Sequence, residues 1–97
     1  MSDENQRFHA LILGFVQGVN FRYYTTQTAR RIGVTGWVRN RADSTVEVVA
    51  EGTRPQLDEL LEFLSHGPPS ARVDQVQTKW EDPTGEYTNF EVATWSG

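Results

Sequence analysis

The sequence predicts an α+β domain in which an antiparallel β-sheet carries two helices on one face. Extended and helical patterns follow one another in the order β-α-β-β-α-β, and each helical segment has one apolar stripe that needs a sheet to cover it. No linker, repeat or low-complexity run divides the 97 residues, which suffice for one core but not for two. We therefore expect one domain at residues 7–97, preceded by a flexible tail at residues 1–6.

The first half of the chain predicts a strand, a helix and a β-hairpin. Residues 7–14, RFHALILG, alternate in the manner of a strand that ends at a glycine. From Phe21 the apolar residues follow helical spacing, and Gly33 is placed to end that helix. The segments 34–40, VTGWVRN, and 45–51, TVEVVAE, then predict two paired strands joined by a turn.

The second half predicts another helix and two more strands. A capping-box pattern from Thr53 to Gln56 marks the start of the helix, and Gly67 with the two prolines after it marks the end. Two extended segments follow, ARVDQVQTKW and the short NFEVA. This order is that of the ferredoxin-like split βαβ sandwich with a short extra C-terminal strand. The expected buried stripe of the helix is Leu57, Leu60, Leu61 and Leu64.

Composition argues against several function classes. The chain has no cysteine, so it can form neither a disulfide nor a thiolate metal site, and we expect a cytoplasmic location. Its polar, acidic start lacks the pattern of a secretory signal, and no window approaches the roughly 18 consecutive apolar residues of a membrane span. The net charge of −4 disfavours a general nucleic-acid binder. Any anion must therefore be bound by a local site.

The stretch GFVQGVNFR, Gly14 to Arg22, is a candidate for such a site. It connects a strand to a helix N-terminus, so its amides can converge on an anion beside the positive end of the helix. Gly14 can open the turn, and Gly18 can take a positive φ or let a ligand approach the backbone. Arg22 leans back over the loop, where its guanidinium can hold two oxygens of a phosphoryl or carboxylate group. From the loop alone, a tight turn followed by a surface arginine explains the pattern equally well.

Familiar nucleotide-binding loops do not occur in this sequence. The pattern G-x-x-x-x-G-K-[ST] is missing, and with it the lysine and the magnesium-binding hydroxyl of an ATP-binding loop. The pattern G-x-G-x-x-G is missing as well. The sequence therefore does not support nucleoside triphosphate binding.

Three segments, GFVQGVNFR, GWVRNRADSTVEV and GPPSARVDQV, resemble the acylphosphatase family in order and spacing, from about Phe8 to Val92. Members of this family have the ferredoxin-like fold and hydrolyse the carboxyl-phosphate bond of acyl phosphates to a carboxylate and inorganic phosphate, without a metal or a covalent phosphoenzyme. The resemblance implies that Arg22 and Asn40 are catalytic. Arg22 and the loop amides would hold the phosphoryl group, and Asn40 would orient the attacking water. The implied phosphate-binding loop consists of Phe15, Val16, Gln17, Gly18, Val19, Asn20 and Phe21.

The resemblance also sets expectations for partners. The substrate would be a small acyl phosphate, and inorganic phosphate or sulfate would compete with it. No cofactor, metal, nucleic acid or membrane partner is expected, and the protein is expected to be a monomer. A neutral residue such as Asn40 suits this chemistry because it places no carboxylate beside an anionic substrate.

Two positions depart from the family pattern or vary within it. Asp43-Ser44 stands where the family usually has Asp-Gly, so Asp43 or Ser44 must take a positive φ, or the turn differs. Asn20 lies at a variable position, where it can narrow or polarise the mouth of the loop.

Two other functions remain open on this architecture. One is an RNA-binding module, against which the negative net charge and the lack of an RNP-type basic and aromatic strand both argue. The other is a domain that senses an anion without turnover. Arg22 fits the enzyme and the sensor alike, whereas Asn40 at a matched position favours the enzyme.

Overall fold

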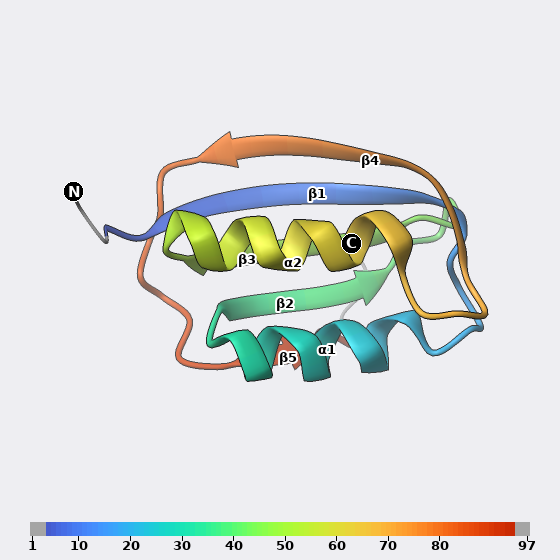
Figure 1. Ribbon diagram of the computed structural model, residues 1–97, viewed down its shortest axis with the longest axis horizontal. Helices are drawn as coiled ribbons and strands as arrows, with labels where there is room; N and C mark the ends of the chain where they lie inside the picture. Colours follow the sequence, from blue (N-terminus) through green and yellow to red (C-terminus); the bar gives the residue numbers. More distant parts are fainter. Residues whose placement is uncertain (1–3, 95–97) are drawn as a thin grey trace.

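A computed structural model describes residues 4–94, and within them the chain forms five strands and two helices in the expected order (Figure 1). The ferredoxin-like α+β fold is therefore confirmed. The elements are β1 (Gln6–Phe15), α1 (Phe21–Ile32), β2 (Thr35–Asn40), β3 (Val46–Gly52), α2 (Arg54–His66), β4 (Arg72–Glu81) and β5 (Phe90–Val92).

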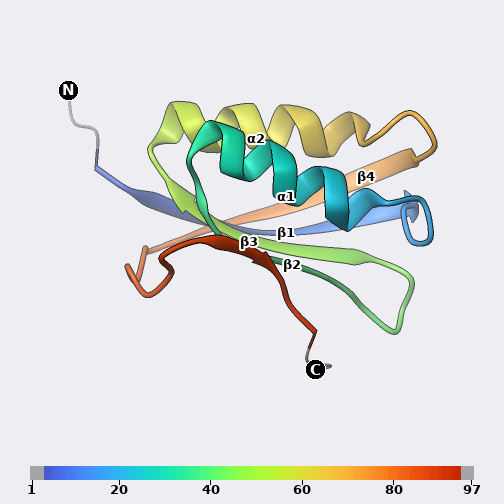
Figure 2. The same cartoon turned by 90° about the horizontal axis from the view of Figure 1, so that it is seen from below.

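The strands form one sheet in the order β4-β1-β3-β2-β5, and both helices cover the same face of it (Figure 2). The pairs β1–β3, β1–β4 and β2–β3 are antiparallel, as expected. The short β5, however, pairs with β2 in parallel, with Gly36 opposite Phe90. The expected antiparallel pairing therefore holds for β1 to β4, and the short extra strand extends the sheet in parallel, because the connection after β4 crosses the molecule before β5 begins.

The hydrophobic core lies between the sheet and the helices. Phe8 and Ile12 lie on the same face of β1 and are fully buried, as are Val46 and Val48 of the adjacent β3. Burying a side chain of this size stabilises the fold by about 1.5–3 kcal/mol. Helix α2 buries Leu57, Leu60 and Leu64, whereas Leu61 of the predicted stripe is only partly buried.

The ends of the helices follow the expected signals. The predicted capping box is present at α2, where Thr53 Oγ1 accepts from the Gln56 amide at 3.4 Å and Gln56 Oε1 accepts from the Thr53 amide at 2.9 Å. Helix α1 ends at Gly33, whose φ is 100° and whose N–H bonds the Ala29 carbonyl at 2.9 Å. The start of α1 has no side-chain cap, so its N-terminus is left open beside the preceding loop.

The role expected for Gly14 needs correction. Strand β1 does not end at this glycine but runs to Phe15, and Gly14 lies where the β1–β4 register shifts. Its φ is 135°, and a Cβ on it would lie 2.2 Å from the Arg72 carbonyl oxygen. Glycine is therefore required for the close approach of β4 at an irregularity in the ladder.

The predicted N-terminal tail only partly overlaps the described residues. Residues 1–3 lie outside them, and Gln6, assigned to the tail, is already the first residue of β1. Within residues 4–94, neither helix is long and apolar enough to cross a membrane.

Candidate functional site

A pocket of about 670 Å³ lies along α1 and beside the loop that precedes it. This loop lies at the end of the molecule where β1 and β2 finish (Figure 1). The walls of the pocket come from the loop before α1, from one side of α1, and from β2 and β5. Six of the predicted site residues line it: Val16, Gly18, Asn20, Phe21, Arg22 and Asn40. The other three, Phe15, Gln17 and Val19, are not among its lining residues.

The loop before α1 contains two residues in the left-handed region. Gly18 has a φ of 76°, as the sequence suggested, and a Cβ on it would meet no atom within 4 Å. Asn20 has a φ of 64°, which asparagine tolerates better than most residues. The Asn20 side chain makes no capping bond and lines the pocket instead. The loop backbone therefore faces open space at Gly18 and turns sharply into the helix at Asn20.

The N-terminus of α1 has the features of an anion site. Its first turn contains no acidic side chain, and its first helical hydrogen bond runs from Tyr24 N–H to the Asn20 carbonyl at 3.1 Å. The amides that precede Tyr24 in the first turn have no carbonyl of this kind to bond, and the helix dipole adds positive potential there. Phe21 is buried in the core and holds this turn in place.

Arg22 supplies a cation at the same place. Its side chain is exposed and lines the pocket. The Thr26 hydroxyl donates to the Arg22 carbonyl at 2.9 Å, but no described residue bonds or pairs with the Arg22 guanidinium. All five N–H donors of the guanidinium are therefore available to a ligand.

Asn40 reaches the pocket from the sheet. It is the last residue of β2 and lies opposite Val46, on the same face as the buried Val38, so its side chain points toward the helices. Its Oδ1 is buried, and no described residue donates a hydrogen bond to it. A buried acceptor without a donor costs about 1–3 kcal/mol, so this oxygen has strong capacity to accept from a ligand or a water.

Gln17 has a structural role that the sequence did not suggest. Its Nε2 donates to the carbonyls of Arg41 at 2.8 Å and Thr45 at 2.9 Å, both in the β2–β3 hairpin. On the other side of the loop, the Ser70 hydroxyl donates to the Val19 carbonyl at 3.2 Å. These bonds hold the loop in a fixed position relative to Asn40, which immediately precedes the hairpin. They join residues far apart in the chain, so no local motif could have indicated them.

The hairpin turn after Asn40 has the positive φ expected from the family pattern. Ser44 adopts it, with a φ of 76°, in place of the usual glycine. Asp43 Oδ1 accepts from the Thr45 hydroxyl at 2.6 Å and from the Thr45 amide at 3.1 Å. The Thr45 hydroxyl, with the Thr45 amide, holds the pKa of Asp43 below its ordinary value. The turn therefore keeps its geometry at the cost of strain at Ser44.

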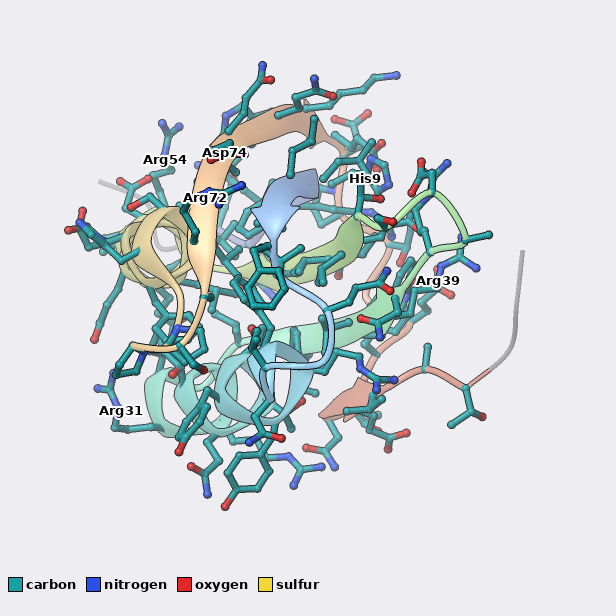
Figure 3. The ribbon with its side chains drawn as sticks, turned by 90° about the vertical axis from the view of Figure 1, so that its right-hand side faces the viewer. His9, Arg31, Arg39, Arg54, Arg72 and Asp74 are labelled. Atoms are coloured by element: carbon teal, nitrogen blue, oxygen red, sulfur yellow. The ribbon has the colours of Figure 1, made fainter. Side chains whose placement is uncertain are left out.

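The opposite face of the sheet carries an ionic cluster that also bears on Asn40. Glu47 of β3 accepts from Arg39 Nε at 2.6 Å and from His9 Nε2 at 2.5 Å, and Figure 3 shows His9 and Arg39 on this side. Burial raises the pKa of Glu47, but the bonds from His9 and Arg39 more than offset this, so the net pKa is lowered. The cluster ties β1, β2 and β3 together next to Asn40 and takes no part in the pocket.

No group of three or more His, Asp or Glu side chains among residues 4–94 is placed to hold a metal ion. The pocket offers instead hydrogen-bond donors from the backbone, the guanidinium groups of Arg22 and Arg30, and the side chain of Asn40, whose Oδ1 is buried without a partner. The fold is that of a ferredoxin-like domain, and its pocket combines backbone amides with arginine, which are groups that can hold a small oxyanion.

Comparison with known proteins gives the family. The acylphosphatase family model matches residues 8–92. The acylphosphatase of Pelotomaculum thermopropionicum is 48% identical over 87 residues, which cover 90% of this chain and 95% of that protein. The structure of an acylphosphatase from Coxiella burnetii, 36% identical, superimposes with a TM-score of 0.86 over 92% of this chain and 93% of that one. The structure of the Bacillus subtilis acylphosphatase, which is 29% identical, superimposes with a TM-score of 0.88 over 92% of this chain and 99% of that one. The chain belongs to the acylphosphatase family.

Proposed function

We propose that this protein hydrolyses acyl phosphates, with Arg22 and the loop before α1 binding the phosphoryl group and Asn40 orienting the water. Membership of the acylphosphatase family supports the reaction. One observation carries the assignment of residues: Asn40, whose buried Oδ1 has no hydrogen-bond partner among the described residues, lines the same pocket as Arg22, whose guanidinium is unpaired. The Asn40 oxygen needs a hydrogen-bond donor, and the Arg22 guanidinium needs an anion.

The phosphoryl group is held by donors alone. The guanidinium of Arg22 contacts two of its oxygens, and the amides around Gly18 and at the start of α1 contact the others. These groups are fixed before the substrate arrives, so little reorganisation accompanies the development of charge in the transition state. Phosphoryl transfer asks mainly for positioning and charge stabilisation, and this pocket supplies both.

Water attacks the phosphorus atom from the side of Asn40. Its hydrogen bond to Asn40 Oδ1 points a lone pair at phosphorus. A new P–O bond forms, the P–O bond to the acyl group breaks, and the carboxylate leaves with the bonding electrons. The water protons pass to phosphate and solvent. A carboxylate is a weak base, with a pKa of about 4 for its acid, so its departure needs little acid catalysis.

The same oxygen argues against a domain that only senses an anion. A hydrolase must orient a water, and a buried acceptor oxygen without a partner suits that task. A domain that only binds an anion needs hydrogen-bond donors and has no use for this oxygen. An RNA-binding role is disfavoured by the net charge of −4. The monomeric state, the cytoplasmic location and the absence of nucleic-acid and membrane partners stay predictions of the proposal.

The reaction class can be tested with two substrates that differ in the leaving group. Purified protein should hydrolyse benzoyl phosphate rapidly and phenyl phosphate hardly at all, because the described residues that line the pocket include no carboxylic acid or histidine to protonate a departing phenolate. Excess EDTA should leave the rate unchanged, and inorganic phosphate or sulfate should compete. Comparable rates on both substrates would contradict the proposal, and so would a loss of activity in EDTA that magnesium or zinc restores.

A further inference from the structure

The pocket is longer than a phosphate site requires. Beyond Arg22 it continues along α1 past Thr26 to Gln27 and Arg30. Arg30 follows Arg22 by eight residues, which places their Cα atoms about 12 Å apart along the helix. A phosphoryl group bound near Arg22 would therefore leave the Arg30 end of the pocket to the acyl part of the substrate.

Arg30 is held in place without being neutralised. Its Nε donates to the Phe90 carbonyl of β5 at 2.9 Å, which ties the side chain to the sheet wall of the pocket. Phe90 itself is fully buried, so this anchor is rigid. No described residue pairs with the two terminal amino groups of Arg30, and no carboxylate lines the pocket. The fixed stem leaves four N–H donors for a ligand.

Arg31, the next residue along α1, is paired with a carboxylate, unlike Arg30. Helix α1 carries Arg22, Arg30 and Arg31 and no acidic residue, although the whole chain has a net charge of −4. Arg31 NH1 pairs with Glu59 of α2 at 3.2 Å, on the side of α1 away from β5 (Figure 3). Arg31 does not line the pocket, whereas Arg22 and Arg30 both do. The pocket therefore holds two uncompensated cations, and phosphoryl transfer at one end accounts for only one of them.

We propose that Arg30 forms a second anion subsite that favours acyl phosphates whose acyl group carries a carboxylate remote from the phosphoryl group. This inference rests on the proposed function, because it assigns the acyl end of the same pocket. The remote carboxylate binds the terminal amino groups of Arg30 in a charge-assisted contact. A plain acyl group leaves the subsite unused and is hydrolysed through Arg22 and Asn40 alone.

A rigid pair of substrates isolates this contact. Benzoyl phosphate and 4-carboxybenzoyl phosphate differ only in a para carboxylate, which cannot fold back on the reacting group. Arg30→Gln is a suitable variant because Gln Nε2 is as many bonds from the backbone as Arg Nε, so the bond to the Phe90 carbonyl can persist. Arg31→Gln is the matched control, because it makes the same change of net charge one residue away and outside the pocket.

The wild type should have the higher kcat/KM on 4-carboxybenzoyl phosphate. Arg30→Gln should lower this kcat/KM about tenfold, mainly by raising KM. The same variant should change kcat/KM on benzoyl phosphate by less than about twofold. Arg31→Gln should leave the ratio of the two kcat/KM values unchanged. A wild type without the preference would overturn the subsite, as would equal losses on both substrates in Arg30→Gln, or the same selective loss in Arg31→Gln.

A binding measurement separates this inference from the proposed function. Calorimetric titration with phenylphosphonate and 4-carboxyphenylphosphonate needs no turnover. Wild-type protein should bind the carboxylated probe more tightly, and Arg30→Gln should abolish the difference while Arg31→Gln retains it. If benzoyl phosphate is not hydrolysed, the proposed function fails even when this difference appears. If benzoyl phosphate is hydrolysed but the probes bind equally, the subsite alone fails.

Discussion

The guanidinium of Arg22 is planar, with donors in a fixed fork, and nothing among the described residues competes for them. We expect Arg22→Lys to lower kcat/KM on benzoyl phosphate by roughly 10²-fold or more, because an ammonium cannot contact two phosphoryl oxygens in the same geometry. Steady-state kinetics checks this, with Arg31→Lys as the control outside the pocket. Near-normal turnover in Arg22→Lys would remove Arg22 from the site.

At the residue scale, the sequence resemblance singled out residues that the fold brings together, but it did not indicate how they are held. The resemblance pointed to Arg22 and Asn40, and both line one pocket. The burial of Asn40 Oδ1 could not be predicted, because it depends on how segments distant in the sequence pack at the end of β2. The hydrogen bonds from the Gln17 side chain to the hairpin were not predicted either, because they also join distant segments.

At the scale of the elements, the β2–β3 hairpin offers a stability test. Ser44 carries a φ of 76°, which costs an L-residue about 1–2 kcal/mol, and glycine avoids most of this cost. We expect Ser44→Gly to raise the free energy of unfolding by roughly 0.5–1 kcal/mol, measured by urea denaturation. Turnover should stay close to wild type, because Ser44 does not line the pocket. Ser44→Ala keeps a Cβ and should bring no such gain; equal gains in the two variants would show that φ is not the cause.

The boundaries of most elements were predicted within one or two residues because their signals are local. The capping box at Thr53 and the glycine at position 33 mark helix ends by bonds within one turn. The direction of β5 could not be predicted, since a three-residue strand has no pattern that distinguishes a parallel from an antiparallel partner. The continuation of β1 through Gly14 also depends on its partner strand β4.

At the scale of the whole molecule, the Glu47 cluster links stability to pH. The pKa of Glu47 is lowered in the folded chain, so the unfolded chain binds its proton more readily. The contribution of Glu47 to the free energy of unfolding is therefore complete above the ordinary glutamate pKa of about 4.3. It is lost as the pH falls through the lower pKa that Glu47 has in the folded chain. We expect Glu47→Gln to be less stable than wild type at pH 7 and to lose less stability on acidification.

Urea denaturation at pH 7 and at pH values below 4 measures this difference. Glu51 retains part of the wild-type pH dependence in the variant, because its pKa is also lowered, with burial opposed by bonds from Thr84, Gly85 and Arg7. Glu59→Gln is the control, since its partner Arg31 and Glu59 itself are both largely exposed. An unchanged pH dependence in Glu47→Gln would mean that the cluster does not couple folding to this proton.

At the scale of the whole protein, we propose that Arg22 binds the phosphoryl group while Asn40 orients the water, and Asn40→Ala tests this proposal most directly. The measurement is kcat on benzoyl phosphate together with the inhibition constant for inorganic phosphate and the urea midpoint. If Asn40 orients the water, kcat should fall on the order of 10²–10³-fold, roughly 3–4 kcal/mol of transition-state stabilisation. Phosphate affinity, which needs no attacking water, should change by less than about tenfold. A variant with near-normal kcat and a lowered urea midpoint would instead make Asn40 a structural residue of the hairpin and contradict the mechanism.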